Sequence, residues 1–351
     1  MTAQTGPHRI AGGPEPGRLQ PVRRGNGLCA ALDLGTNNCR LLIAQPNAGS
    51  FRIVDAFSRI VRLGEGVAES RRLTEEAMRR TIDALKVCAA KIRRRGVLRG
   101  RYVGTAACRK ADNNAQFIER VKAETGIDIE TITAEEEARL TLAGCLPLID
   151  RTRRHALVFD IGGGSTEVMW LTNDGASARM CDWTSLPFGV VTLTERYGRG
   201  PFEEQRYRTI LDDLQNHLEP FCRRHGIDRL VTESAVQMLG ASGTVTTLAG
   251  MSLGLSRYDR TRVDGSFLEF DVVHELAGRL RGMSVRDRAA HPCIGRDRAE
   301  MMLAGCAILE AMCRRWPVGR LRVADRGLRE GILVDLFRRR QSPAVGGHGG
   351  S

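Results

Sequence analysis

One short pattern occurs twice in this sequence, and the repeat constrains the fold more than any other feature. Residues 31–38 read Ala-Leu-Asp-Leu-Gly-Thr-Asn-Asn, and the pattern returns 127 positions later around Asp160. Each copy has an apolar run ending in an aspartate (Asp33 or Asp160), a glycine-containing turn and a second apolar run. This order predicts a strand, a tight turn and a returning strand. Two such hairpins indicate two similar half-structures that hold one phosphate-bearing ligand from opposite sides.

Strand and helix patterns alternate in both halves of the chain, which predicts the α/β class. Strands are expected at residues 28–34, 39–44, 51–62, 102–105, 127–133 and 321–324, with a strand, turn and strand over 156–171. Helices are expected at residues 75–95, 113–124, 134–145, 203–224 and 328–339, and helical segments are expected to dominate 272–316.

Pro147 and the arginines at 151, 153 and 154 mark a plausible domain boundary. We expect domain I over residues 27–148, completed by a C-terminal helix at 326–340, and domain II over 153–325. Residues 1–26 and 341–351 are expected to be a disordered leader and tail, because they lack an apolar core segment.

The formal net charge of +12 fits either a basic solvated surface or attraction to a polyanion. No helix-turn-helix, zinc-finger or RNA-binding signature is present, so we expect no nucleic-acid partner. No apolar run approaches the roughly 18 residues of a membrane span, so we expect no membrane association. The ten cysteines form no CxxC pair, and buried thiols in a reducing cytoplasm are the simplest interpretation.

Asp33 and Asp160 end strands beside glycine turns. A carboxylate next to phosphate is repelled unless a cation bridges the two, and Mg²⁺ accepts carboxylate, water and phosphate oxygens together. The alternative for each aspartate is a turn residue that bonds its own backbone. The segment that follows Asp160 predicts a phosphate loop, in which backbone N–H groups, two hydroxyls and a nearby carboxylate face the ligand or its metal: Gly162, Gly163, Gly164, Ser165, Thr166 and Glu167.

Three further segments carry candidate chemistry. Glu135, Glu136 and Glu137 open a helix, where one carboxylate could activate a water or all three could merely stabilise the helix dipole. Arg109 lies between a strand and a helix start and is a candidate phosphate clamp, or a solvated surface residue. A third small-residue loop leads into a helix whose bare amides favour an anion or a nucleotide: Ser242, Gly243 and Thr244.

Taken together, these motifs resemble the exopolyphosphatase and guanosine pentaphosphate phosphohydrolase family. The resemblance covers residues 28–339 and is carried by six segments in order: residues 33–37, 104–113, 136–140, 160–167, 241–244 and 327–333. It implies two ribonuclease-H-like domains of the actin, sugar-kinase and heat-shock-chaperone type with a cleft between them. It further implies Mg²⁺-dependent release of terminal phosphate from inorganic polyphosphate or guanosine pentaphosphate, and a homodimer is a further expectation.

The resemblance also assigns roles. It makes Glu137 the catalytic carboxylate, Asp160 and Glu167 the residues tied to metal and attacking water, and Arg109 the phosphate-binding arginine. In the first hairpin it places Gly35, Thr36, Asn37 and Asn38 against the substrate. Residues 133–137 depart from the family pattern, because Thr-Ala and three glutamates replace the usual Ser-Gly start.

Two other functions fit the same motifs. An ATP-dependent kinase on this scaffold would use the three glycine-rich elements for ATP, although the glutamates and Arg109 argue against it. A non-catalytic regulator would bind polyphosphate or nucleotide without turnover. The chain resembles the short form of the family, and the sequence does not rank polyphosphate against guanosine pentaphosphate.

Overall fold

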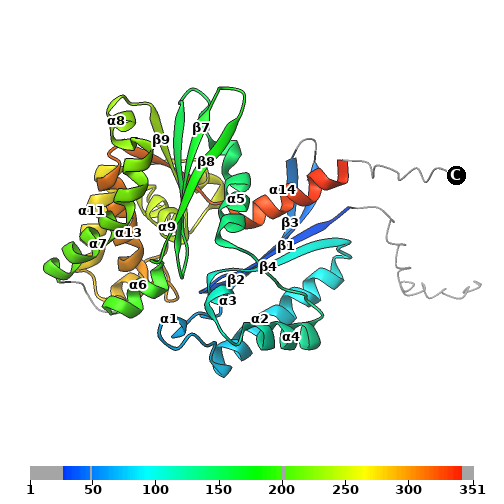
Figure 1. Cartoon of the computed structure of the whole chain (residues 1–351). Coiled ribbons are helices and arrows are strands. Elements are labelled where there is room, and N and C mark those ends of the chain that lie inside the picture. The colour runs from blue at the N-terminus through cyan, green and yellow to red at the C-terminus, as the bar shows by residue number, and fades with distance from the viewer. Residues whose placement is uncertain (1–26, 48–49, 199–202, 342–351) are drawn as a thin grey trace, which may run out of the picture.

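The computed structural model describes residues 27–47, 50–198 and 203–341, which form two β-sheets flanked by helices (Figure 1). The first sheet has the order β3-β2-β1-β4-β5, with β1 Cys29–Leu34, β2 Asn38–Asn47, β3 Ser50–Ile60, β4 Arg99–Gly104 and β5 Glu130–Thr131. The second has the order β10-β11-β9-β6-β7-β8, with β6 His155–Ile161, β7 Thr166–Asn173, β8 Ala178–Leu186, β9 Val236–Ala241, β10 Phe267–Glu269 and β11 Arg320–Ala324.

The two sheets repeat one plan. Strands β1, β2 and β3 form an antiparallel meander, and β4 then pairs parallel with β1. Strands β6, β7 and β8 form the same meander, and β9 pairs parallel with β6. The α/β fold predicted from the sequence is therefore confirmed, and the repeated motif marks the first turn of each meander.

The helices surround both sheets. Those before the second sheet are α1 Val67–Ser70, α2 Glu75–Arg94, α3 Ala106–Lys110, α4 Asn114–Thr125 and α5 Ala134–Cys145, followed by the 3₁₀ turn η1 Leu146–Leu148. The helices that follow strand β8 in the chain are α6 Val190–Tyr197, α7 Glu204–His225, α8 Ile227–Thr232, α9 Gly243–Ser252, α10 Arg260–Val263, α11 Phe270–Gly282, α12 Val285–Ala290, α13 Met302–Arg315 and α14 Leu328–Gln341.

Alternating side chains along β6 bury both faces of the second sheet. Leu157 and Phe159 face the larger core beneath α7, α9, α11 and α13, whereas Ala156 and Val158 face α5. The first sheet likewise packs α2 and α4 on one face and α14 on the other. Helix α5 contributes Ala138 to the core of the second sheet and Leu140 to that of the first. It therefore lies between the two sheets.

Some elements differ from the sequence prediction. The helical segments expected over residues 272–316 are three helices, and the chain between α12 and α13, which contains Pro292 and Gly295, runs as turns. Strand β8 was not predicted, since its charged residues interrupt the apolar alternation on a strand at the sheet edge. Strand β5 is only two residues long. The expected leader and the end of the tail lie outside the described residues.

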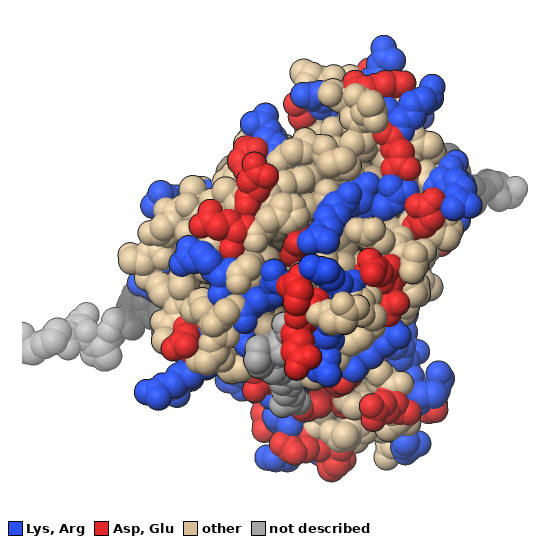
Figure 2. Space-filling model, turned by 90° about the vertical axis from the view of Figure 1, so that its left-hand side faces the viewer, with Lys and Arg blue, Asp and Glu red and all other residues tan. Residues whose placement is uncertain are grey.

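Figure 2 shows lysine and arginine side chains interspersed with aspartate and glutamate on one face of the molecule. Among the described residues, no helix is both long enough and apolar enough to cross a membrane.

Candidate active site

The two hairpin turns have the same backbone. In the first, the Gly35 N–H donates to the Asn38 carbonyl at 2.9 Å, and in the second the Gly162 N–H donates to the Ser165 carbonyl at 3.0 Å. Asp33 and Asp160 occupy matching positions at the ends of β1 and β6. The repeat in the sequence is therefore a repeat in three dimensions.

The turns also contact each other, and this explains the run of glycines in the second. A Cβ added to Gly163 would lie 2.9 Å from the Cβ of Thr36, and one added to Gly164 would lie 2.6 Å from the Thr36 hydroxyl oxygen. Real Cβ atoms do not approach so closely. The Thr36 side chain of the first turn thus occupies the space that the second turn leaves empty.

A cavity of about 130 Å³ lies between the turns. Because a water molecule takes about 30 Å³, the cavity has room for a phosphoryl group. Most of the sequence-predicted residues line it: Asp33, Gly35, Thr36, Asn37, Asn38, Glu137, Asp160, Gly162, Gly163, Gly164, Ser165, Ser242, Gly243 and Thr244. Thr166, Glu167 and Arg109 are not among the residues that line this cavity. In the described part of the chain, the N–H groups of Gly163 and Gly164 have no protein acceptor and remain available to a ligand.

The structure separates the three glutamates at the start of α5. Thr133 caps the helix by accepting a hydrogen bond from the Glu136 N–H. Glu135 is exposed to solvent, and the Glu136 carboxylate accepts hydrogen bonds from Arg101 and Arg139, which lower its pKa to about 2. Only Glu137 of the three lines the cavity.

Arg109 and Glu167 lie just behind the lining. The Arg109 guanidinium donates to the Glu137 carboxylate at 2.7 Å and to the Ile132 carbonyl at 3.1 Å. The Glu167 carboxylate is 2 % exposed and accepts from the hydroxyls of Ser165 and Ser185 at 2.7 and 3.1 Å. Arg109 therefore holds Glu137 of the cavity wall, and Glu167 holds Ser165. The roles of Arg109 as a phosphate clamp and of Glu167 as a metal ligand stay predictions.

Burial of these carboxylates raises their pKa values. The pKa of Asp160 is raised to about 8, first by loss of solvent and then by the charge of Glu167, its cross-strand neighbour. Loss of solvent also raises the pKa of Asp33. The pKa of Glu137 is raised by loss of solvent and by the charge of Glu167, although the neighbouring Arg109 acts to lower it. A cluster of acids whose charged forms are this unfavourable is ready to accept a cation or a proton.

Four basic residues at or near the cavity were given no role of their own in the sequence analysis. Lys110 donates from its Nζ to the Gly164 carbonyl at 3.1 Å, and Arg40 and Arg298 line the cavity. Arg329 lies at a second chamber behind the aspartates. Arg40 had a detectable signal, because it follows Asp33 by the same seven positions that separate Glu167 from Asp160. Arg298 comes from a distant segment that only packing brings here, whereas Arg329 lies in the segment 327–333 that carries the family resemblance.

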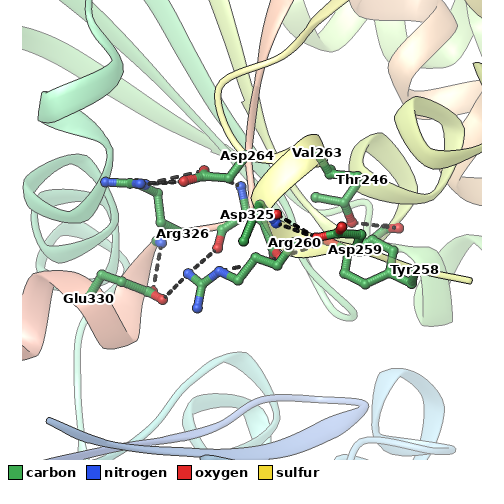
Figure 3. A network of polar contacts seen from close by, with 12 residues as sticks. Thr246, Tyr258, Asp259, Arg260, Val263, Asp264, Asp325, Arg326 and Glu330 are labelled. Carbon is green, nitrogen blue, oxygen red and sulfur yellow. Dashed lines mark hydrogen bonds and ion pairs between the residues drawn. The ribbon is translucent and has the colours of Figure 1, made fainter. Parts of the chain in front are cut away.

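An ion-pair network fixes the start of α14 and the turn before it (Figure 3). The Glu330 carboxylate accepts from the Arg260 guanidinium at 2.7 Å and from the Gly327 N–H at 3.0 Å. Asp264 pairs with Arg326, and the Tyr258 hydroxyl donates to Asp325 at 2.7 Å. These contacts hold the start of α14 against the second sheet, so that Gly327 lies beside Asp160.

The donor set fits a magnesium ion that shares its coordination with substrate. The described residues contain no group of three or more metal-ligating side chains that could form a complete cage. Mg²⁺ does not need one, since it commonly takes one or two carboxylates and completes its shell with water and phosphate oxygens. Asp33 and Asp160, which line the same small cavity, supply that number of carboxylates.

Comparisons with known proteins agree with this geometry. The sequence model of the Ppx/GppA phosphatase family matches residues 42–340. The chain is 32% identical over 321 residues to exopolyphosphatase 2 of Mycobacterium tuberculosis, covering 88% of this chain and 98% of that protein. It is 30% identical over 317 residues to a guanosine-5'-triphosphate,3'-diphosphate pyrophosphatase of Photobacterium profundum, again over 88% of this chain but only 59% of that protein.

Solved structures give the same result. The Aquifex aeolicus member of the Ppx/GppA family is similar with a TM-score of 0.73 and 30% identity, covering 90% of this chain and 99% of that one. An exopolyphosphatase from Cytophaga hutchinsonii is similar with a TM-score of 0.80 and 25% identity, covering 89% of this chain and 98% of that one.

Proposed function

Because this chain belongs to the Ppx/GppA phosphatase family, we propose that it is a hydrolase that releases terminal orthophosphate from inorganic polyphosphate. One observation carries the proposal. The carboxylate of Glu137 and the free amides of Gly163 and Gly164 line one small cavity that has room for a phosphoryl group. A general base and a set of phosphate-binding donors therefore converge on the same small space.

In the proposed reaction, Glu137 orients a water and accepts its proton as the water oxygen attacks the terminal phosphorus. The bridging P–O bond breaks, and the shortened chain leaves with the electron pair. The amides of the second turn hold the phosphoryl oxygens as charge develops on them. Burial raises the pKa of Glu137, which makes its carboxylate a stronger base than an exposed one.

Asp160 and Asp33 would hold Mg²⁺, which supplies charge neutralisation for the phosphate oxygens when bound. Glu167 on β7 lies directly opposite Asp160 on β6 and adds negative charge at that end of the cavity. We infer a direct contact for Asp160 and place Glu167 behind it, because two serine hydroxyls already bind the Glu167 carboxylate.

Guanosine pentaphosphate is the second candidate substrate. It has support from relatives at about 30% identity whose names refer to that nucleotide, although this chain spans only 59% of their length. We further propose a cytoplasmic location, because all ten cysteines are free thiols. The domain division at residues 148–153 and the homodimer remain proposals.

The test of the activity is phosphate release from polyphosphate by the purified chain, with Mg²⁺ and with a chelator. We expect release only with the metal. Absence of release under every condition would exclude the hydrolase, and equal release with the chelator would exclude the role of the metal.

The test of the base is the series Glu137→Gln, Glu136→Gln and Glu135→Gln. The amide keeps the size of the side chain but accepts no proton. Glu137→Gln should lower kcat by about 10²–10⁴ with little change in polyphosphate binding, because a positioned base contributes that factor. Glu135→Gln should have almost no effect, and Glu136→Gln should mainly lower stability through its lost arginine pairs. A larger kcat loss at Glu136 or Glu135 would overturn the assignment.

A further inference from the structure

The two hairpin turns differ in how the rest of the chain holds their carbonyl groups. In the first turn, the Asn37 carbonyl accepts from the N–H groups of Val61 and Arg62 at 2.9 and 3.1 Å. Gly164 occupies the matching position of the second turn. Its carbonyl accepts instead from a side chain, the Nζ of Lys110, at 3.1 Å. A lysine thus takes the place that two backbone amides have in the first turn.

The contact with Lys110 fixes a part of the second turn that is otherwise free. The two preceding carbonyls, those of Gly162 and Gly163, accept from backbone N–H groups at the start of α6. In the described part of the chain, the Gly164 carbonyl has no hydrogen-bond donor other than Lys110. Because a glycine backbone adopts many conformations, this one donor limits how the peptide after Gly164 is oriented.

That peptide joins Gly164 to Ser165 and is trans. In a planar trans peptide the N–H points away from the carbonyl, so the Ser165 N–H points away from Lys110. Ser165 lines the cavity between the turns, whereas Lys110 is not among the lining residues. The carbonyl is therefore held outward and the Ser165 N–H is directed to the cavity side. Among the described residues this N–H has no protein acceptor, so it is available to a ligand.

Helix α3 reaches both chemical groups of the site through its last two residues, Arg109 and Lys110. Arg109 donates to the carboxylate of Glu137, and Lys110 donates to the carbonyl of Gly164. The start of the helix also packs closely on the turn, since a Cβ added to Gly164 would lie 3.2 Å from that of Ala106. One short helix thus sets the proposed base against the phosphate-binding turn.

The surroundings of Lys110 favour hydrogen bonding over a free charge. Its side chain is half-buried, and in the described part of the chain its ammonium has no carboxylate within ion-pair distance. Burial and the neighbouring Arg109 lower the pKa of Lys110, although Glu167 acts to raise it. The amine donates an N–H to the Gly164 carbonyl in either protonation state.

We propose that Lys110 is a positioning residue, which holds the Gly164 carbonyl outward so that the Ser165 N–H binds an oxygen of the terminal phosphoryl group. This rests on the proposed hydrolysis of polyphosphate, in which that group enters the cavity between the turns. Lys110 acts through the turn and does not itself contact the substrate. Its loss therefore weakens binding of the phosphoryl group, whereas loss of the base Glu137 slows the chemical step.

The experiment compares Lys110→Met and Lys110→Arg with the wild-type chain. Methionine keeps the length of the side chain but donates no hydrogen bond, and arginine restores the donor. The matched control is Lys122→Met, which removes the same charge from an exposed lysine on α4 that pairs with Asp128. KM and kcat are measured for tripolyphosphate and for long-chain polyphosphate, with thermal unfolding as the control for folding. If Lys110→Met does not fold, Lys110→Ala repeats the test.

We expect Lys110→Met to raise KM about 10-fold for both substrates, because both present the same terminal group and one well-placed hydrogen bond is worth about that factor. The value of kcat should change little, as expected when an interaction is lost equally before and during the reaction. Lys110→Arg should recover most of the loss, and the control should behave like the wild-type chain. An unchanged KM in Lys110→Met, or an equal rise in Lys110→Arg, would overturn the proposal.

The dependence on salt separates positioning from direct attraction. The slope of log KM against log salt should be the same for Lys110→Met and the wild-type chain, because Lys110 acts on a carbonyl and neutralises no phosphate. A slope smaller by about 1 in Lys110→Met would mean that the ammonium itself contacts a phosphate. That result would overturn the positioning role.

A binding measurement keeps this test separate from the proposed activity. Calorimetric binding of tripolyphosphate, measured without Mg²⁺, should be about 10-fold weaker in Lys110→Met and unchanged in Lys122→Met. If this difference is found but the wild-type chain releases no phosphate, the hydrolase proposal fails and the role of Lys110 stands. If turnover is normal and binding is equal in all the proteins, the role of Lys110 fails alone.

Discussion

The two hairpins have the same backbone hydrogen bond in their turns, but they differ in the residue that lies opposite each aspartate on the neighbouring strand. Asp33 on β1 is opposite Arg40 on β2, whereas Asp160 on β6 is opposite Glu167 on β7. The first hairpin therefore brings a compensated pair of charges to the cavity, and the second brings two negative charges. The excess negative charge, and with it the need for a cation, lies on the second hairpin.

The turns differ in a complementary way. The first carries side chains at Thr36, Asn37 and Asn38, and the second carries Gly163 and Gly164 at the two positions that match Thr36 and Asn37. The side chain of Thr36 fills the space above those glycines. A duplicated hairpin thus gives one turn that supplies side chains and one that supplies bare amides.

The largest test of this comparison is Asp160→Asn against Asp33→Asn. Asp160→Asn should lower kcat by about 10³-fold or more, because the charge that the metal neutralises is worth several kcal/mol and 1.4 kcal/mol corresponds to a factor of ten. Asp33→Asn should cost at least tenfold less, because Arg40 already compensates that carboxylate. The measurement is kcat during Mg²⁺ titration, with thermal unfolding as the control for folding. Equal losses at the two aspartates would show that the hairpins contribute alike.

A smaller effect is expected from filling the turns. Gly164→Ala should destabilise the fold by about 1–3 kcal/mol, because its Cβ would meet the Thr36 hydroxyl at 2.6 Å and Ala106 at 3.2 Å. Gly35→Ala should be nearly neutral, since the nearest atom to its added Cβ is 3.6 Å away. The measurement is urea unfolding.

Adding Thr36→Ala to Gly164→Ala should recover part of the lost stability, because it removes the clashing hydroxyl. Strict additivity of the two substitutions would contradict the proposed contact between the turns.

The smallest effect concerns the third strand of each meander. Asp55 on β3 pairs with Lys91 and Arg95 near the end of α2, and Asp182 on β8 pairs with Arg224 and His225 at the end of α7. The hydrogen bond from Lys91 lowers the pKa of Asp55 to about 2. A lowered folded-state pKa gives stability that is complete above the unfolded value near 3.8 and is lost as pH falls through about 2.

Asp55→Asn should therefore lower stability at pH 7 by about 1 kcal/mol and flatten the loss of stability between pH 4 and pH 2. The measurement is the free energy of unfolding in urea from pH 7 to pH 2. Asp182→Asn is the matched variant in the other sheet. A wild-type acid profile in Asp55→Asn would exclude these pairs as the source of the pH dependence.

The sequence predicted the α/β class, both hairpins and the helix that carries Glu137, because these depend on local periodicity and turn residues. Most residues of the cavity between the turns were also predicted, since they cluster in short motifs. Arg298 was not, because no local pattern relates it to the hairpins. Without the family resemblance, the sequence could not separate Glu136 from Glu137. Their separation in the structure depends on Arg101 and Arg139, which bind Glu136 and leave Glu137 to the cavity.

Helix α14 has a consequence for the order in which the chain folds during synthesis. Ile332, Leu333 and Phe337 of this helix cover the face of the first sheet that contains Ala31 and Leu42. That sheet is made before the second sheet, yet this face has no cover from α14 until the last described helix has left the ribosome. The second sheet takes its helices α7, α9, α11 and α13 from the segment that immediately follows its first strands. The N-terminal half therefore completes its core last, against the usual order of synthesis.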